Sequence, residues 1–338
     1  MARATRAAAL ALGLALLGAC GGGDDTRAVE PSPTPATTLP PPTATVTPRP
    51  TATASATPTR SPAARVPAAG GIDELGRIPI LMYHQIRTKL RAPSDRTPAQ
   101  FRADLRRLHA EGYRPVTAAD YVAGNIDLPV GTHPVVLTFD DSSAGQAQIG
   151  PDGEPEPDTA LGILEAFGRA HPDFRPTATF FVLTNRIPFN DPDVLPWLAA
   201  NGYEIGAHTQ SHPQLPDLDD LAVQEQIGAN VADIEAAVPG YRVRTFATPY
   251  GRLPRNPELA WRGSHNGVPY EFTGVFGTGG TAALSPFAPA FDPYAIPRLA
   301  AGLSAAEAVL AELRRRPELR YTSDGGPDRV SGGRRASA

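Results

Sequence analysis

The sequence predicts an α/β fold with a mainly parallel sheet, and two observations lead to this prediction. Short apolar runs alternate with helical patterns from Gly71 onward, which is typical of βαβ units. Polar side chains repeatedly follow the apolar runs, and the carboxyl ends of parallel strands are where ligands bind in β/α barrels and open α/β sheets. This region has roughly 250 residues, enough to bury one sizeable core.

The first half of this region is expected to contain three strands and two helices. Three short apolar runs, rich in β-branched and aromatic residues, predict buried strands at Ile78–Tyr83, Val135–Phe139 and Ala178–Leu183. Residues 98–113 have apolar side chains on one helical face and arginines on the other, which predicts an amphipathic helix. A second helix is expected from Thr159 to Ala170.

The second half continues the alternation with shorter elements. A helix is expected at Val194–Asn201, and strands are expected at Tyr203–Ala207 and Thr245–Ala247. Residues 221–238 have apolar side chains at helical spacing, so they predict a long helix. A last helix is expected to open with the capping-box pattern of Ser304–Glu307.

The two ends of the chain differ in composition from this region. Residues 1–19 have the pattern of a signal peptide, and Leu17–Cys20 resembles the lipobox of bacterial lipoproteins, whose cysteine is lipidated after cleavage. The alternative is an ordinary secretory signal with an accidental cysteine. Residues 20–70 are expected to be a disordered tether, because residues 31–67 include 11 Pro, 10 Thr and 7 Ala. Residues 323–338 are expected to be a disordered tail.

Composition excludes several classes of function. The formal net charge is −4, without the basic excess expected of a protein that neutralises many phosphates, so no nucleic-acid partner is expected. Cys20 is the only cysteine, which excludes intramolecular disulfides and multi-cysteine metal sites. A metal site would have to use His, Asp or Glu. No protein partner is predicted.

Two clusters of side chains could carry chemistry. Asp140 and Asp141 end an apolar strand, where a cation or a proton would relieve their repulsion; loop aspartates are the alternative. His208 and His212 are four residues apart and would share a face on a helical turn; two surface histidines are the alternative. One carboxylate with two imidazoles forms a ligand set typical of hydrolytic zinc and non-haem iron, and the second aspartate is a natural general base.

These residues belong to three motifs that occur in a recognisable order. Thr138–Asp141, His208–His212 and Thr248–Gly251 resemble the successive motifs of the NodB-type polysaccharide deacetylases, carbohydrate esterase family 4. Residues 80–84, Ile-Leu-Met-Tyr-His, are similar to the branch that includes the poly-N-acetylglucosamine deacetylases of biofilm matrices. The resemblance extends over most of residues 71–322, which are therefore expected to be the deacetylase domain.

The resemblance implies a fold, a metal and a reaction. The fold is a distorted (β/α) barrel of the NodB type, and the cofactor is a divalent metal, usually Zn²⁺, with Co²⁺ or Ni²⁺ in some members. Asp141, His208 and His212 correspond to the metal ligands, and Asp140 corresponds to the catalytic base. The implied reaction is hydrolysis of the acetamide of an N-acetylhexosamine, in which the backbone N–H of Tyr250 helps to hold the oxyanion.

The departing amine must be protonated by a general acid, for which the sequence offers two histidines. Most family members take this acid from a late Leu-x-x-His motif, which is missing here. In the biofilm branch it comes from the histidine that ends the first strand, which matches His84, and His265 is the alternative. His109, His133 and His171 fall outside the motifs and are expected to be surface groups.

Two departures from the family pattern affect the expected site. Ala247 replaces the arginine that commonly precedes the third motif and clamps the catalytic aspartate. Arg298 could supply that clamp from another strand or bind substrate; a solvated arginine is the alternative. Asp141 is followed by Ser142-Ser143, so the loop up to Asp158 is expected to shape the groove differently. Tyr250 is expected to line this groove, unless it packs as a turn aromatic.

The leading hypothesis is a metal-dependent hydrolase that removes N-acetyl groups from an N-acetylglucosamine-containing cell-surface or cell-wall polysaccharide. A lipid on Cys20 would anchor it to the cell membrane on the extracytoplasmic side, with the Pro-rich tether as a spacer. Two alternatives remain: an O-acetyl esterase on a polysaccharide such as acetyl-xylan, and a non-catalytic glycan-binding lipoprotein. The complete Asp-Asp-His-His set argues against the second, because a binding module needs no water-activating base.

Overall fold

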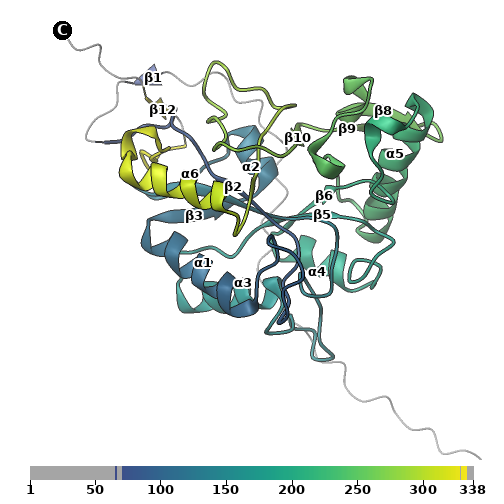
Figure 1. Ribbon diagram of the computed structural model, residues 1–338, viewed down its shortest axis with the longest axis horizontal. Helices are drawn as coiled ribbons and strands as arrows, with labels where there is room; N and C mark the ends of the chain where they lie inside the picture. Colours follow the sequence, from purple (N-terminus) through teal and green to yellow (C-terminus); the bar gives the residue numbers. More distant parts are fainter. Residues whose placement is uncertain (1–64, 67–70, 328, 333–338) are drawn as a thin grey trace, which may run out of the picture. The chain divides into compact units, whose positions relative to one another are not determined.

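The computed structural model describes residues 65–66, 71–327 and 329–332 (Figure 1). The predicted signal peptide, Cys20 and nearly all of the tether lie outside the described residues. Among the described helices, none has both the length and the hydropathy that a bilayer crossing requires.

An eight-stranded sheet forms the centre of the described fold, and all its pairings are parallel. The strand order is β10-β7-β6-β5-β4-β2-β11, and β3 pairs with β4 off this path. The strands are β2 (Ile80–Tyr83), β3 (Tyr113–Val116), β4 (His133–Phe139), β5 (Thr179–Val182), β6 (Glu204–Ala207), β7 (Thr245–Ala247), β10 (Gly274–Phe276) and β11 (Leu299–Ala300). The β/α alternation read from the sequence is therefore confirmed.

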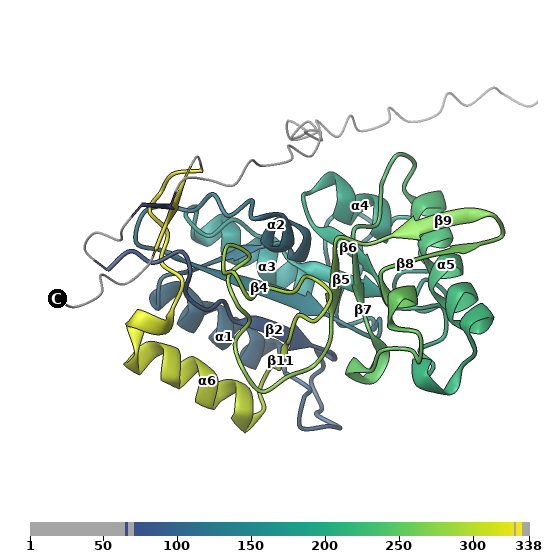
Figure 2. The same ribbon diagram turned by 90° about the horizontal axis from the view of Figure 1, so that it is seen from above.

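Helices pack around this sheet (Figure 2). They are α1 (Pro98–Ala110), α2 (Ala118–Ala123), α3 (Ala160–Ala170), α4 (Val194–Ala200), α5 (Asp220–Ala237) and α6 (Ser304–Arg315). Side-chain caps fix several starting points: Thr97 caps α1 with a complete capping box, and Thr159 and Asp219 cap α3 and α5.

The strands alternate between two apolar environments. In β4, Leu137 and Phe139 pack in the larger core with residues of α1 and α3, whereas Val136 packs in a smaller core with Phe181 and Phe276 of neighbouring strands. Each face of the sheet is thus covered, which explains why these strands read as continuous apolar runs. Burial on both faces fixes their register, because a one-residue slip would exchange the two sets of side chains.

Parallel pairing brings the carboxyl ends of the strands to one edge. Tyr83 of β2 pairs with Phe139 of β4, so His84 and Asp140 emerge side by side. Ala207 of β6 pairs with Phe246 of β7, which brings the segments after these strands to the same edge. This edge carries the residues that the sequence selects.

Three sequence-based expectations need correction. The first helix ends at Ala110 rather than at residue 113, because Gly112 adopts a left-handed φ of 82° and Tyr113 begins β3. Helix α6 begins at Ser304 with Leu303 as its N-cap and no side-chain cap, so the predicted capping box is wrong. His133 is buried rather than on the surface, and its Nδ1 lies 2.8 Å from the carbonyl oxygen of Tyr321.

The segment 323–338, expected to be disordered, is partly ordered. Strand β12 (Val330–Ser331) pairs with β1 (Arg65–Val66). The buried carboxylate of Glu74 accepts hydrogen bonds from the backbone N–H of Ser331 at 2.9 Å and from the hydroxyl of Tyr321 at 3.0 Å. These contacts hold residues 330–331 against β1 and Glu74, and no local sequence pattern predicts them.

An antiparallel hairpin, β8 (Arg262–His265) with β9 (Val268–Glu271), packs beside α5 (Figure 1). Its turn uses Asn266 and Gly267, whose φ values of 50° and 76° suit a tight hairpin.

Candidate metal centre

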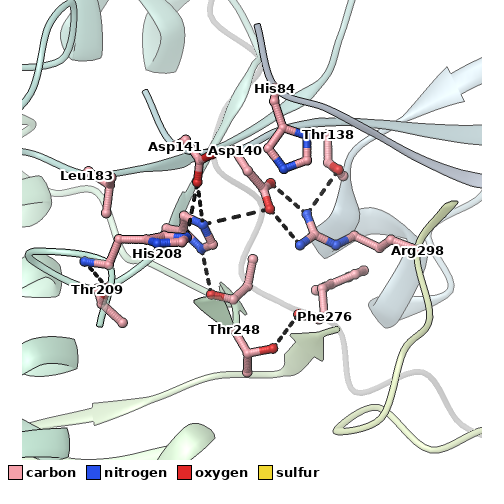
Figure 3. Close-up of polar contacts among 12 residues, drawn as sticks. His84, Thr138, Asp140, Asp141, Leu183, His208, Thr209, Thr248, Phe276 and Arg298 are labelled. Carbon is pink, nitrogen blue, oxygen red and sulfur yellow. Dashed lines mark hydrogen bonds and ion pairs between the residues drawn. The ribbon is translucent and has the colours of Figure 1, made fainter. Parts of the chain in front are cut away.

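Three side chains from the carboxyl edge of the sheet converge on one point, and Figure 3 shows two of them, Asp141 and His208. Asp141 follows β4, and His208 and His212 follow β6. The Nε2 atoms of His208 and His212 lie 3.4 Å and 3.1 Å from Oδ1 of Asp141. All three ligand atoms lie within 4.8 Å of one another, which is the arrangement needed to surround one metal ion.

The imidazole of His208 is oriented as a metal ligand. Its Nδ1 lies 2.8 Å from the carbonyl oxygen of Ala247, an acceptor, so Nδ1 carries the proton and Nε2 presents its lone pair to the cluster. This Nε2 is buried and has no hydrogen-bond partner among the described residues. A buried nitrogen without a partner is costly, and a divalent cation would satisfy it. The residues present therefore fit a metal ion.

The helical turn expected for residues 208–212 is wrong, although the two imidazoles do meet. The segment is a loop in which Thr209 and His212 adopt left-handed φ values of 70° and 61°. The hydroxyl of Thr209 accepts a hydrogen bond from the N–H of His212 at 3.0 Å, which stabilises this unusual path. The rings of His208 and His212 end 4.9 Å apart, centre to centre.

Helix α5 holds the start of this loop. The buried amide of Asn230 accepts a hydrogen bond from the N–H of His208 at 2.9 Å and donates to the carbonyl oxygen of Val182 at 3.1 Å. Asn230 thereby connects β5 and the end of β6. The sequence analysis did not single out Asn230; an asparagine among the apolar residues of this helix is the signal that could have found it.

The backbone beside Asp141 is strained. Asp141 and Ser142 both have left-handed φ values, 72° and 60°, without being glycine. The Ser142 hydroxyl accepts from the N–H of Leu183 at 2.8 Å and so ties the turn to the end of β5. Such strain is retained where the surroundings over-determine it, typically at functional sites.

The second aspartate is buried and paired with arginine. Asp140 is 2% exposed and Arg298 is 1% exposed, and the two form a bidentate pair at 2.6 Å and 2.7 Å (Figure 3). The solvated-arginine interpretation is therefore wrong. Arg298 also donates to the carbonyl oxygen of Gly277 and to the hydroxyl of Thr138, at 3.0 Å and 3.2 Å. Its hydrogen bonds hold Asp140, which is the clamp that the sequence analysis allowed Arg298 to supply from another strand.

The arginine pair decides the charge state of Asp140. Burial alone would raise the pKa of this carboxyl, but the guanidinium of Arg298 and the nearby imidazole of His208 outweigh burial, so the pKa lies below its usual value. Asp140 is therefore an ionised carboxylate at neutral pH, able to accept a proton. Arg298 thereby supplies the clamp for which the sequence analysis found only Ala247 at the expected position.

His84 shares the cavity with these groups, whereas His265 does not. The cavity has a volume of about 180 Å³ and is lined by Met82, His84, Asp140, Asp141, His208, His212, Thr248, Tyr250, Gly251, Thr278 and Arg298. His84 lies beside Asp140 and Arg298 in Figure 3. His265 lies on the β8–β9 hairpin, where its side chain packs near Gly228 of α5.

Gln146, which the sequence did not single out, connects the two strand ends at the site. Its amide nitrogen donates to the carbonyl oxygens of both His84 and Asp140, at 2.6 Å and 2.5 Å. The side chain is fully buried, and its Oε1 has no partner among the described residues. No pattern in the loop sequence distinguishes this glutamine from an exposed one.

Tyr250 forms the outer wall of the cavity. It has a left-handed φ of 57°, is 58% exposed, and its ring lies 4.6 Å from the ring of His212. The alternative of a packed turn aromatic is wrong, because most of the side chain faces solvent.

Comparison with known proteins agrees with this geometry. Residues 128–267 match the family model of the polysaccharide deacetylases. These residues include the three motifs but neither His84 nor Arg298.

Named relatives cover only parts of the chain. The peptidoglycan-N-acetylmuramic acid deacetylase PdaC of Bacillus subtilis is 33% identical over 37% of this chain and 22% of its own length. A chitooligosaccharide deacetylase of a Bradyrhizobium species is 31% identical over 36% of this chain and 48% of its own length. The chain thus spans less than half the length of these two relatives.

Solved structures identify the fold. IcaB from Ammonifex degensii superposes with a TM-score of 0.50 at 20% identity, over 71% of this chain and 97% of the other. BC0361, a polysaccharide deacetylase of Bacillus cereus, gives the same TM-score at 17% identity, over 66% and 64% of the two chains. The predicted (β/α) barrel of the NodB type is confirmed.

Proposed function

We propose that this chain is a metal-dependent hydrolase that removes N-acetyl groups from an N-acetylglucosamine-containing cell-surface or cell-wall polysaccharide. One observation carries the proposal: the ionised, arginine-held carboxylate of Asp140 borders the Asp141-His208-His212 cluster within a single cavity. A hydrolase needs this combination of a ligand set and an independent base, whereas a structural metal site does not.

Asp141, His208 and His212 would hold the ion. Imidazole and carboxylate ligands suit zinc, and we infer Zn²⁺, with Co²⁺ or Ni²⁺ as alternatives. A divalent ion bound there would acidify water and polarise the carbonyl of the scissile amide. Three protein ligands are the number that catalytic zinc sites use.

Two side chains of the cavity, Asp140 and His84, would carry out the two proton transfers of the reaction. The Asp140 carboxylate takes a proton from the attacking water, and Arg298 keeps it ionised and aimed at the cavity. The imidazole of His84 donates a proton to the departing amine, because an unprotonated amide nitrogen is a very poor leaving group. The backbone N–H of Tyr250 donates to the developing oxyanion.

The names of the relatives support an N-acetylated substrate. One is named for N-acetylmuramic acid in peptidoglycan, and the other for chitooligosaccharides. Both names describe deacetylation of amino-sugar polymers, which agrees with a general acid in the cavity. An O-acetyl esterase, acting for example on acetyl-xylan, depends less on such an acid, so His84 favours the amide. A non-catalytic glycan-binding lipoprotein is also disfavoured, because Arg298 supplies the clamp that Ala247 lacks.

Acetate release tests the proposal. The zinc-loaded chain should release acetate from N-acetylglucosamine oligomers, and Asp140→Asn should lower kcat by at least about a hundredfold while metal content is retained. His84→Ala should reduce activity on the oligomer far more than activity on an aryl acetate ester. Equal release by wild type and Asp140→Asn would contradict the assignment of the base, and a chain active only on esters would support the esterase.

We also propose that the protein is extracytoplasmic and anchored to the cell membrane by a lipid on Cys20. The support is the sequence alone, namely the apolar run and the lipobox-like Leu17–Cys20. Mass spectrometry of the protein isolated from membranes should find a mature N-terminus at Cys20 that carries acyl chains. Cys20→Ser should release the protein into the soluble fraction, and an unmodified Cys20 would contradict the anchor.

A further inference from the structure

Helix α5 presents a row of polar side chains to the loop that carries two of the three candidate metal ligands. Gln226, Asn230 and Asp233 are four and three residues apart, so they lie along one face of the helix. Each of them is hydrogen-bonded to residues 208–212, the segment that contains both histidines of the cluster. Asn230 holds the start of this loop, and the other two residues of the row hold its middle.

Gln226 binds the middle of the loop through its backbone and its side chain. Its carbonyl oxygen accepts a hydrogen bond from the N–H of Gln210 at 2.8 Å. Its side-chain Oε1 accepts from the N–H of Ser211 at 3.0 Å, and the exposed Ser211 hydroxyl donates to the same oxygen at 3.0 Å. Together with the bond from His208 to Asn230, α5 therefore accepts from three of the five backbone N–H groups of the loop.

Asp233 binds the loop through the side chain of Gln210. Its Oδ2 accepts hydrogen bonds from Nε2 of Gln210 at 2.8 Å and from the hydroxyl of Thr184 at 2.9 Å. Thr184 follows β5, so this carboxylate connects the segments after two neighbouring strands. Neither Gln226 nor Asp233 lines the metal cavity, and both reach the candidate ligands only through the loop.

The helix itself is fixed from another side. The hairpin β8–β9 packs on α5, where Oε1 of Gln224 accepts a hydrogen bond from the N–H of Ser264 at 3.0 Å. Gly228 lies so close to the hairpin that a Cβ there would be 2.3 Å from the Cβ of His265. Because α5 is held by the hairpin and by its own buried apolar residues, it can serve as a rigid support for the loop.

The loop needs such a support because its backbone is unfavourable. Thr209 and His212 adopt left-handed φ values of 70° and 61°, which residues with a Cβ rarely do. A loop that relaxed from this conformation would move its two imidazoles away from Asp141. An ion would then have to reorder the loop on binding, and that ordering cost would weaken its affinity.

We propose that Gln226 and Asp233 are positioning residues of the candidate metal centre, which set its affinity for a divalent ion by holding residues 208–212 in the strained conformation. The inference rests on the proposed metal-dependent function for the identity of the site. It concerns the binding of the ion rather than the hydrolysis, so it can be measured without a glycan substrate.

Zinc affinity tests the proposal. The Kd of the full chain for Zn²⁺ is measured by competition with a chromogenic chelator. Gln226→Met keeps an unbranched side chain but removes the Oε1 acceptor, and Asp233→Ala removes the carboxylate. Each should raise the Kd about tenfold, as the loss of a group that orients a metal ligand does. The matched control is Glu225→Met, an exposed neighbour on the same helix, which should leave the Kd unchanged.

Two conservative variants separate positioning from charge. Gln226→Glu adds a negative charge and Asp233→Asn removes one, but each keeps an oxygen that accepts the same hydrogen bonds. If position matters, both variants should bind zinc as the wild type does. Tighter binding by Gln226→Glu together with weaker binding by Asp233→Asn would show an effect of charge alone and would overturn the proposal.

Hydrogen exchange reports on the loop in the absence of metal. In the metal-free Gln226→Met chain, the amide of Ser211 should exchange at least about tenfold faster than in the wild type, whereas amides of β4 and β6 should exchange at the same rate. Unchanged exchange at Ser211 would contradict the support by Gln226. A general loss of protection would instead identify a purely structural role and would also overturn the proposal.

The outcomes distinguish this inference from the proposed function. Equal zinc affinity in Gln226→Met and Glu225→Met would overturn the inference, even if the wild type releases acetate. Because the side chain of Asp233 is exposed, Asp233→Ala decides the question if Gln226→Met fails to fold. A chain whose zinc affinity depends on these residues but that releases no acetate would contradict the deacetylase function alone. A wild type that binds no zinc would contradict both.

Discussion

The buried pair of Arg298 and Asp140 gives the most demanding prediction. Arg298→Met keeps an unbranched side chain but removes the guanidinium, which leaves the Asp140 carboxylate buried without its two hydrogen bonds of 2.6 Å and 2.7 Å. Breaking a buried ion pair by removing one partner costs about 3–5 kcal/mol, because the remaining charge is uncompensated. Two hydrogen bonds to a charged group, each worth about 1.5–3 kcal/mol, lead to the same range.

The assay is a double-mutant cycle of denaturant unfolding on the metal-free protein. Arg298→Met should lower the free energy of unfolding by about 3–5 kcal/mol. Arg298→Met combined with Asp140→Asn should be less destabilised than the sum of the single variants, by about 2 kcal/mol or more, because the buried carboxylate charge is gone. Arg106→Met, an exposed arginine on α1, is the control and should change stability by less than about 0.5 kcal/mol.

Activity gives a second reading of the same variant. Since Arg298 aims the carboxylate of Asp140 at the cavity, Arg298→Met should lower kcat/KM by about a hundredfold in protein that is still folded. A strictly additive cycle, or wild-type activity in folded Arg298→Met, would refute the reasoning that this arginine positions the base.

Three further predictions follow from the geometry. Gln146→Met removes the donor to the carbonyl oxygens of His84 and Asp140. In steady-state kinetics it should lower kcat about tenfold with little change in KM. A change confined to KM would contradict this prediction. Burial and the nearby Arg320 lower the pKa of His133 to about 4 from its usual value near 6.5. The unfolded chain therefore binds this proton more tightly than the folded protein does. The free energy of unfolding should fall as the pH drops from about 6.5 to 4, by about 3 kcal/mol at most. His133→Asn should remove this contribution, and identical pH profiles of unfolding free energy for variant and wild type would contradict it. His212→Ala removes one of three metal ligands and should weaken zinc affinity by at least about tenfold in a competition titration, whereas Ser211→Ala, which keeps the loop, should not.

The sequence predicted the central strands well, because strands buried on both faces of the sheet consist of consecutive apolar residues. It also grouped Asp141, His208 and His212, which the structure brings together, although it assigned the wrong local structure to residues 208–212. The left-handed φ values of Thr209 and His212 depend on contacts with α5 and on a threonine hydroxyl, which periodicity does not encode.

Long-range partners were the hardest to predict. The sequence offered Arg298 as a clamp on the catalytic aspartate but could not separate that role from a solvated arginine, because the two residues are 158 positions apart and the pairing of β11 with β2 brings them together. The role of Gln146 was equally hard to predict, because its partners are the backbone carbonyl oxygens of His84 and Asp140, which no side-chain pattern in the sequence indicates.

The most direct test is the position of a bound ion. Anomalous X-ray scattering from a zinc-soaked crystal of the full chain should place one ion within about 2.0–2.2 Å of a carboxylate oxygen of Asp141 and of the Nε2 atoms of His208 and His212, with Asp140 outside the ligand set. Zinc bound by Asp140, or found away from these imidazoles, would contradict the account.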